Sequence, residues 1–310
     1  MAAKRILLIA NPASGNRQGE QRLAEAKSHL EALGHSVAAK LTEAPGHAAD
    51  LAGAVAIQYE IIAALGGDGT VNEVANGLMA VEPGERPALA TLPVGTGNDV
   101  ARTFGLANFE SAIDALVNGN TRTLDVIRVQ LMRDGKSVTR HSLLFVAAGF
   151  AAEVIRKTGP RVKRIFGRRF SYSVGFFRAL ASFRAPEFSV KWDSGEKAGR
   201  MFQVCAGNTE FAAGGVMRIS PGARPDDGLL NISLVGALGQ LGIVRRFPSI
   251  LSGRYVEDDR VDYFTSKRLE IDAVPPAELQ ADGDIIGTTP ATVELLPGAL
   301  RLVVHDQFQV

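Results

Sequence analysis

The stretch that decides the fold runs from Glu60 to Ala80, EIIAALGGDGTVNEVANGLMA. Residues 61–65, after Glu60, form an apolar run of strand length, and the glycine-rich turn Gly66–Thr70 follows. Residues 70–80 then have the periodicity of a helix, with Thr70 and Glu73 spaced as a capping box. A buried strand, a glycine turn and a helix in this order predict one unit of an α/β sheet.

The same alternation extends in both directions over the first 125 residues. The expected strands are 4–10, 36–42, 60–65 and 87–92, and the expected helices are 18–33, 46–57, 70–80 and 109–117. This alternation predicts a doubly wound, Rossmann-like parallel sheet with its ligand-binding loops at the carboxyl ends of the strands.

Beyond residue 125 the pattern changes to short β runs joined by tight turns. Asp134-Gly135 and Ser194-Gly195 each lie between two such runs, which is a strong hairpin signal. One helix, 172–183, interrupts the series. The expected strands are 126–132, 137–148, 188–192, 199–206, 229–235, 268–273, 292–296 and 300–305. We therefore expect an α/β domain over 1–125 and a mostly antiparallel β-sandwich over 126–310, whose last strand can return to the first domain.

Composition excludes several classes of protein. The chain has 310 residues, 46% of them hydrophobic and 22% charged, which is typical of a folded protein with room for two domains. A formal net charge of +1 gives no general attraction to nucleic acid. The single cysteine, Cys205, excludes an internal disulfide and a cysteine-based zinc site. No membrane span is expected, and the cytoplasm is the expected location.

The turn Gly66–Thr70 is the sharpest functional signal. Its glycines let the backbone approach an anion closely, and the start of the following helix offers unpaired N–H groups and a favourable dipole. The turn is not a Walker A loop, because no Gly-Lys-Ser/Thr follows, and it is not GxGxxG, because Asn72 occupies the last position. The alternative is a plain glycine turn in which Asp68 caps the helix. We favour a phosphate site.

Two further turns strengthen that interpretation. Pro93–Asp99 (PVGTGND) and Asn11–Gly15 (NPASG) also follow expected strands. The ends of parallel strands lie on one edge of a sheet, so the three turns are expected to lie side by side. Adjacent anion-binding loops suit a polyphosphate, and the spacing predicts a nucleotide site.

These turns resemble, in order, the motifs of the diacylglycerol-kinase catalytic-domain family, and they are most similar to those of its soluble bacterial lipid kinases. The resemblance continues through residues 206–208 (AGN), 214–215 (GG), 225–230 (PDDGLL) and 282–283 (DG), and so covers nearly the whole chain. NAD kinases and phosphofructokinases share a GGDG-type turn but are not expected to combine Gly95–Asp99 with Asp226–Leu230.

The resemblance implies that ATP binds in a cleft between an N-terminal α/β domain and a C-terminal β-sandwich. The implied ATP contacts are Asn11, Thr42, Gly66, Gly67, Asp68, Gly69, Thr70, Val71, Asn72, Gly95, Thr96 and Asp99. Asp68 would hold a catalytic magnesium ion with support from Asp99. Asp227, with backbone carbonyl groups near Arg224 and Leu229, would bind a second, structural magnesium ion.

The resemblance also implies a general base in the carboxylate that follows Asp282-Gly283. The family usually has glutamate there, and this chain has Asp284, whose side chain is shorter by one methylene, roughly 1.5 Å. Asn231 stands where the family often has another acid, a smaller departure. The implied activity is an ATP- and magnesium-dependent lipid kinase that converts diacylglycerol to phosphatidic acid. The alternatives are a kinase for a sphingoid base or phosphatidylglycerol, and a nucleotide- or lipid-binding regulator with weak turnover.

A basic cluster between residues 156 and 169 points to a membrane surface. Seven cations fall within these 14 residues, apolar residues are interleaved with them, and no acid occurs from Val154 to Pro186. A solvated basic loop is the alternative, but basic and apolar residues together are typical of peripheral membrane contact. We expect Arg164, Arg168 and Arg169 to contact anionic lipid at the inner membrane face.

Overall fold

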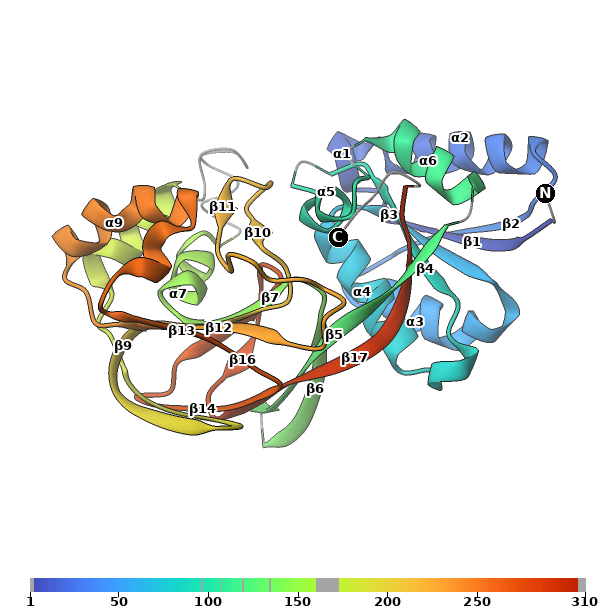
Figure 1. The fold of residues 1–310 in the computed structure, drawn as a ribbon. Helices are drawn as coiled ribbons and strands as arrows, with labels where there is room; N and C mark the ends of the chain where they lie inside the picture. The colour runs from blue at the N-terminus through green and yellow to red at the C-terminus, as the bar shows by residue number, and fades with distance from the viewer. Residues whose placement is uncertain are drawn as a thin grey trace. The chain divides into compact units, whose positions relative to one another are not determined.

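The computed structural model describes residues 3–95, 97–106, 108–118, 120–133, 135–159 and 173–305 (Figure 1). Its contacts divide the chain into two compact units. Unit 1 comprises Met1–Val126, Ala213–Gly215 and Pro297–Val310, and unit 2 comprises Ile127–Ala212 and Val216–Leu296. The domain boundary expected at residue 125 stays a prediction.

Unit 1 is built on a parallel sheet with the strand order β2-β1-β3-β4. Both β3 and β4 are buried along their whole length, because helices cover both faces of the sheet. The end of β17 extends the sheet beyond β4, where Leu302 pairs with Leu89 in parallel. The strands are β1 (Arg5–Ala10), β2 (Ser36–Leu41), β3 (Ile61–Gly66), β4 (Ala88–Pro93) and β17 (Ala291–Val303).

The helices of unit 1 lie on both sides of this sheet, as Figure 1 shows. α2 and α6 cover one face, where Leu30 and Leu116 pack against Leu8 and Leu65 in one apolar core. α3 and α4 pack together on the other face. The predicted doubly wound α/β fold is therefore confirmed. The helices are α1 (Ser14–Arg17), α2 (Gly19–Ala32), α3 (His47–Val55), α4 (Asp68–Met79), α5 (Asp99–Thr103) and α6 (Phe109–Asn118), with short 3-10 turns at Ala56–Gln58 and Pro83–Glu85.

The predicted capping box is wrong. α4 begins at Asp68, two residues before Thr70, and its N-cap residue Gly67 has no side chain to cap it. Glu73 instead accepts hydrogen bonds from the backbone N–H groups of Gly46 (2.9 Å) and Ala48 (3.2 Å), at the start of α3. The carboxylate of one helix therefore caps its neighbour, which spacing along one helix cannot reveal.

Unit 2 is a β-sandwich whose strand pairs are mostly antiparallel, which confirms the predicted class. The long strand β9 joins its two sheets, because its first half pairs with β8 and its second half with β7 and β12. The strands are β6 (Lys136–Ser142), β7 (Phe145–Gly149), β8 (Glu187–Trp192), β9 (Gly195–Gly207), β10 (Phe211–Ala212), β11 (Met217–Arg218), β12 (Leu230–Gly236), β13 (Val261–Ser266), β14 (Arg268–Val274), β15 (Glu278–Ala281) and β16 (Asp284–Thr288). The end of β5 (Thr121–Arg133), from Ile127 onward, and the start of β17, up to Leu296, also belong to unit 2.

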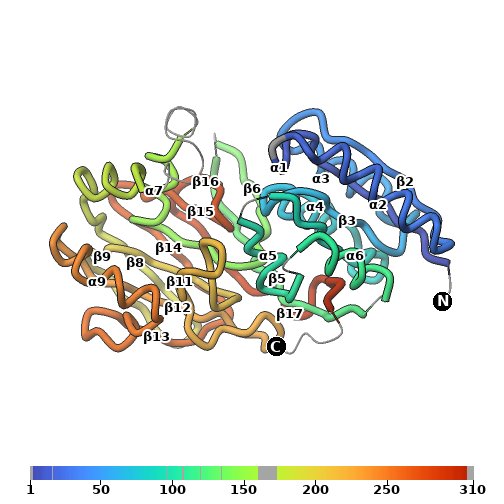
Figure 2. Tube along the Cα trace, turned by 90° about the horizontal axis from the view of Figure 1, so that it is seen from above, coloured from blue at the N-terminus to red at the C-terminus, as the bar shows by residue number. Residues whose placement is uncertain are grey.

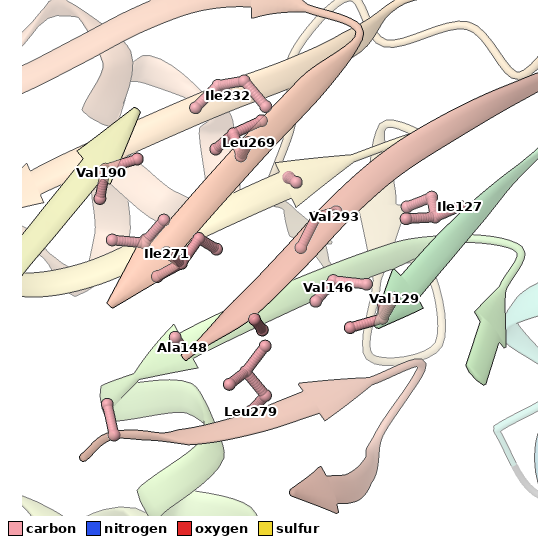
Figure 3. Packing of buried hydrophobic residues seen from close by; sticks show 14 of the residues in the cluster. Ile127, Val129, Val146, Ala148, Val190, Ile232, Leu269, Ile271, Leu279 and Val293 are labelled. Atoms are coloured by element: carbon pink, nitrogen blue, oxygen red, sulfur yellow. The ribbon is translucent and has the colours of Figure 1, made fainter. Parts of the chain in front are cut away.

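The core of unit 2 lies between these sheets. Figure 3 shows Val146 and Leu279 from one sheet facing Leu269, Ile271 and Val293 from the other, and all five side chains are buried. Alternating apolar residues on each strand supply this layer, as expected for sandwich strands that expose their other face.

Helices cover one side of this sandwich (Figure 2). They are α7 (Phe150–Lys157), a helix over residues 173–182, and α9 (Gln240–Ser252), which is followed by a 3-10 turn at Arg254–Glu257. The helix predicted at 172–183 is present where the structure describes it, but the prediction of a single helix is wrong. α7 has only 8 residues, and α9 contains Pro248 and Gly242, so neither gives a strong periodic signal. No helix among the described residues is both long and apolar enough to cross a membrane.

Two predicted strand boundaries are also corrected. The run 137–148 is two strands, β6 and β7, separated by Leu143 and Leu144. The runs 292–296 and 300–305 are one strand, β17, in which Pro297-Gly298 does not make a turn. Gly298 has φ +58° there, and its N–H donates to Asp125 Oδ1 at 2.7 Å, so the chain bends and continues.

Candidate nucleotide and phosphoryl-transfer site

Three turns meet at the carboxyl ends of β1, β3 and β4 in unit 1. The Asn11 N–H donates to Leu65 O at 3.1 Å, which ties the first turn to the end of β3. The Val94 N–H donates to Gly66 O at 3.0 Å, which ties the third turn to the second. The sequence-based expectation that the three turns lie side by side agrees with this arrangement.

Only glycine fits at several positions of these turns. A Cβ at Gly95 would lie 2.8 Å from Gly67 Cα, and a Cβ at Gly66 would lie 2.5 Å from Thr70 Oγ1. Gly15 has φ +57°, and a Cβ there would lie 2.5 Å from Val94 O. The glycines therefore let three backbone segments pack closely at one end of the sheet, where a polyanion can meet main-chain groups.

Asp68 occupies the centre of this arrangement as the first residue of α4. Its Oδ1 accepts a hydrogen bond from the Val100 N–H at 3.0 Å, at the start of α5. No residue that the structure describes donates to its Oδ2, and a Cβ at Gly97 would lie 3.0 Å from that atom. One oxygen of Asp68 thus positions two helices, and the other is available to a ligand.

Asp99, the first residue of α5, lies close enough to Asp68 to interact electrostatically. The backbone N–H groups of Ala213, Gly214 and Gly215 face its carboxylate, and these three residues all have positive φ. Such a run of N–H groups forms an anion-binding nest. Burial raises the pKa of Asp99, and the negative charge of Asp68 raises it further, against the opposing effect of the nest.

Two asparagines add buried oxygens beside these acids. Oδ1 of Asn72, on α4, and Oδ1 of Asn98, before α5, are buried and accept no hydrogen bond from the described part of the chain. Asn98 is held in a left-handed conformation, φ +54°, by its Nδ2 bond to Gly95 O at 2.8 Å. Unsatisfied buried oxygens are costly unless a donor or a cation approaches them.

This donor set fits a magnesium ion that is shared with a nucleotide. Magnesium takes oxygen ligands, and it is usually held by one or two carboxylates together with substrate phosphates. Among the residues that the structure describes, no three His, Cys, Asp or Glu side chains gather as a complete protein cage. Asp68 and the Asn98 oxygen would hold the ion together with the phosphates, and Asp99, whose carboxylate accepts hydrogen bonds from the nest, would support the same site.

The other predicted ATP contacts divide by exposure. The side chains of Thr70 and Val71 are buried, and their N–H groups donate to Gly67 O at 3.0 and 3.2 Å, so their contact with a nucleotide stays a prediction. Asn11 Oδ1 accepts the Ala13 N–H at 2.9 Å and shapes its own turn. Thr42 follows β2 and donates its N–H to Ala10 O at 2.9 Å, next to the end of β1. Thr96 lies outside the described residues.

Asp282 and Asp284 lie in one turn of unit 2, between β15 and β16, and differ sharply in their surroundings. Asp284 is exposed and begins β16, paired with Ala281 across the turn. Asp282, with φ +47°, accepts four hydrogen bonds, from Ser142 Oγ (2.7 Å) and from the backbone N–H groups of Leu143 (2.7 Å), Leu144 (3.0 Å) and Phe145 (2.9 Å). Burial raises the pKa of Asp282 to about 6, against the lowering effect of these bonds.

The predicted structural magnesium ligands, Arg224, Asp227 and Leu229, share one turn of unit 2. The Leu229 N–H donates to Asp227 Oδ1 at 2.9 Å, and Arg224 pairs with Asp226 at 3.6 Å. The turn is shaped by its own carboxylates, and its role in metal binding stays a prediction.

The predicted membrane residues Arg164, Arg168 and Arg169 lie outside the described residues. At the start of the basic cluster, Arg156 pairs with Glu153 and with Glu278 (3.0 Å), and Lys157 pairs with Glu153 at 3.5 Å. These two cations are neutralised by acids that lie outside the acid-free stretch of sequence.

Sequence reasoning named Asp68 and Asp99 but missed their partners. In the sequence, the nest at 213–215 is recognisable only as the glycine pair Gly214-Gly215. Asn98 is recognisable only as one residue of the motif that ends at Asp99. The role of Asp282 depends on a loop 140 residues earlier in the chain, and no local pattern marks that pairing.

Both halves of the chain match known protein families. Residues 5–129 match the diacylglycerol kinase catalytic domain, and residues 144–304 match the YegS C-terminal NAD kinase beta sandwich-like domain. A diacylglycerol kinase from Staphylococcus aureus is 30% identical over 292 residues, which cover 93% of this chain and 88% of that protein.

Solved structures show the same fold. The crystal structure of a diacylglycerol kinase from Bacillus anthracis superposes with a TM-score of 0.75 at 24% identity, over 99% of this chain and 98% of that one. Yeast NADH kinase superposes with a TM-score of 0.51 at 11% identity, over 98% of this chain and 84% of that one. The resemblance read from the motifs is confirmed, and so is the expectation of a lipid kinase.

Proposed function

The chain belongs to the diacylglycerol kinase family, and from this premise we propose that it transfers the γ-phosphoryl group of ATP to a lipid hydroxyl, with magnesium as the metal ion. The observation that carries the proposal is the available Oδ2 of Asp68, which lies at the start of α4 beside Gly97 of the third turn. Phosphoryl transfer needs positioning and charge neutralisation more than covalent chemistry, and these residues are suited to both.

Each part of the unit 1 site has a role in this proposal. The backbone of Gly66–Thr70 and of Gly95 binds the phosphates. Asp68 holds the magnesium ion, and Asp99 supports the same site from its nest at 213–215. The bound ion would neutralise charge on the transferring phosphoryl group. It would also relieve the repulsion between the two acids, because a nearby cation favours their ionised form.

Asp284 is the proposed general base, and it accepts the proton of the attacking hydroxyl. The structure supports this choice over its neighbour Asp282, because both oxygens of Asp282 already accept hydrogen bonds from the loop 142–145. Asp284 has an exposed carboxylate at the end of a turn. A shorter acid in place of glutamate needs a closer approach to the hydroxyl, since proton transfer requires heavy atoms at about 3 Å.

Diacylglycerol is the first acceptor to test, because relatives of this chain carry that name. A sphingoid base and phosphatidylglycerol are the alternatives within the same chemistry, and a regulator with weak turnover is the alternative outside it.

The test is incubation with γ-labelled ATP, magnesium and a panel of dispersed lipids, followed by measurement of label in the organic phase. We expect label in phosphatidic acid for the parent and for Asp284→Glu, and background label for Asp284→Ala with ATP binding unchanged. Label on none of the lipids, with intact ATP binding, would favour the regulator. Unchanged turnover in the alanine variant would overturn Asp284 as base.

A further inference from the structure

α9 carries an apolar stripe on its outer face. The exposed positions of this helix include 241, 244, 245, 248 and 251, which recur at helical spacing and so form one side. Leu241 is 79% exposed, Val244 47% and Leu251 40%, and Pro248 lies between them. The inner side is also apolar, because Ile243 is buried in the cluster of α7 and helix 173–182. A surface helix that rests on a core normally has a polar outer face.

The neighbouring helix 173–182 extends this surface. Phe176 packs against Phe247 of α9 with ring centroids 5.2 Å apart, and Gln240 Nε2 donates to Ala181 O at 3.3 Å. Figures 1 and 2 both show this helix beside α9. Phe177, next to Phe176, is 65% exposed. We call the exposed side chains of Phe177, Leu241, Val244 and Leu251 the α9 patch.

Arginines outnumber acids in the segments that carry the α9 patch, and the acids nearest to α9 in sequence, Glu257 and Asp258, pair with Arg254 and Arg246. No acid occurs from Gly228 to Val256 or from Val154 to Pro186 in the sequence. Arg178, Arg184 and Arg245 are exposed and form no ion pair with any described residue, whereas Arg246 pairs with Asp258 at 2.5 Å. Arg245 lies on α9 and Arg178 on helix 173–182, the two helices that carry the patch. Exposed apolar side chains and arginines without ion pairs on the same helices complement an anionic lipid surface, which attracts cations and accepts apolar groups at its interface.

We infer that the α9 patch docks this protein on an anionic bilayer, with Leu241, Val244 and Leu251 inserted at the interface and Arg178 and Arg245 against lipid headgroups. The inference deepens the proposed function, because an enzyme whose acceptor lies in a bilayer must reach that surface. It involves residues other than the predicted cluster at 156–169.

The experiment is vesicle sedimentation of the full chain, without ATP. Vesicles of phosphatidylcholine with phosphatidylglycerol are compared with vesicles of phosphatidylcholine alone. The variant Leu241→Glu/Val244→Glu changes two exposed positions and should fold as the parent does. Its control, Ile57→Glu/Met132→Glu, introduces the same charge at side chains that are 66% and 52% exposed elsewhere.

We expect the patch variant to lose binding to anionic vesicles by about tenfold or more, since partial burial of a Leu and a Val contributes that much. The control should bind like the parent, and added salt should weaken the parent. Equal loss in variant and control, or unchanged binding of the variant, would overturn the inference. Equal binding of the parent to both vesicle types would contradict the inference that the lipid surface is anionic.

Two further measurements separate this inference from its rivals. Sedimentation velocity without lipid should show the same oligomeric state for parent and patch variant. A parent oligomer that the variant abolishes would assign the patch to a second copy of the chain. If the parent binds vesicles through the patch but labels no lipid, the inference stands and the proposed function fails.

Discussion

Asp68 in unit 1 and Asp282 in unit 2 are both aspartates beside a glycine in a tight turn, yet their surroundings differ. Asp282 accepts four hydrogen bonds from one loop, whereas Asp68 accepts one from a backbone N–H group and retains an oxygen that no described residue approaches as a donor. The number of donors that converge on a carboxylate thus separates an acid that organises the fold from an acid that can hold a ligand.

The largest expected effect on stability follows removal of the saturated acid. Asp282→Ala leaves the N–H groups of Leu143, Leu144 and Phe145 without their acceptor, and each unpaired buried donor costs about 1–3 kcal/mol. We expect the free energy of unfolding to fall by about 4 kcal/mol, measured by urea denaturation. Asp282→Asn keeps one acceptor oxygen and should lose about half as much. A loss below about 1 kcal/mol for the alanine variant would remove the distinction between the two acids.

Asp68→Asn should show the opposite profile. The amide keeps the size of the side chain and an acceptor for the Val100 N–H, so we expect a change in stability below about 1 kcal/mol. Loss of the negative charge beside the phosphates should lower kcat by about 10²–10³-fold. Phosphorylation of dispersed lipid checks the expected fall in kcat, and urea denaturation of the same preparation checks the expected stability. Parental turnover would show that this oxygen holds no catalytic ion.

The pH dependence of stability tests how burial acts on Asp282. Because the pKa of this carboxyl is raised from 3.8 to about 6, its protonated form is favoured in the folded state. The resulting stability is fully present below about pH 3.8 and is lost as pH rises through about 6. The unfolding free energy of the parent minus that of Asp282→Asn should therefore fall by up to about 3 kcal/mol between pH 3.5 and 7. A difference that grows with pH would mean that the hydrogen bonds outweigh burial.

Gly97→Ala should give the smallest effect, and it acts on the available oxygen of Asp68 directly. The new Cβ would lie 3.0 Å from Oδ2, so one of the two must shift. We expect affinity for magnesium–ATP to fall by about tenfold, with a change in stability below about 1 kcal/mol. Gly84→Ala is the matched control, because a Cβ there meets open space. Equal affinities for the two variants, by calorimetric titration, would show that glycine at 97 does not keep the oxygen accessible.

The elements of unit 1 were predictable because their signals are local. Four apolar runs became β1 to β4 within one or two residues of the expected bounds, and the helix predicted at 18–33 became α2. Unit 2 was harder, because its strands depend on partners far away in the chain. The break between β6 and β7 requires Asp282, and the continuity of β17 requires Asp125, neither of which is near in sequence.

In the candidate site too, features with local sequence signals were predictable, and features that depend on distant residues were not. Gly66–Thr70 and Gly95–Asp99 were predictable as neighbours, because parallel strands end on one edge of a sheet. The nest that faces Asp99 was not predictable, because residues 213–215 come from a distant part of the chain and join unit 1 only in three dimensions. The positions of Asn72 and Asn98 within the motifs were evident from the sequence. The burial of their side-chain oxygens was not, because it depends on packing in three dimensions.

The end of β17 has a consequence for biosynthesis. Leu302 pairs beside Leu89 of β4, Arg86 donates to Ala299 O at 2.7 Å, and the Val304 N–H donates to Asn120 O at 3.0 Å. The ribosome makes residues 1–126 first, but the strand that covers the edge of β4 is made only after unit 2. Until then the nascent chain exposes an unpaired apolar edge, the kind of surface that recruits chaperones or pairs with other chains. Ribosome-bound chains that stop before residue 297 should therefore be more sensitive to protease in unit 1 than chains that have released residue 305.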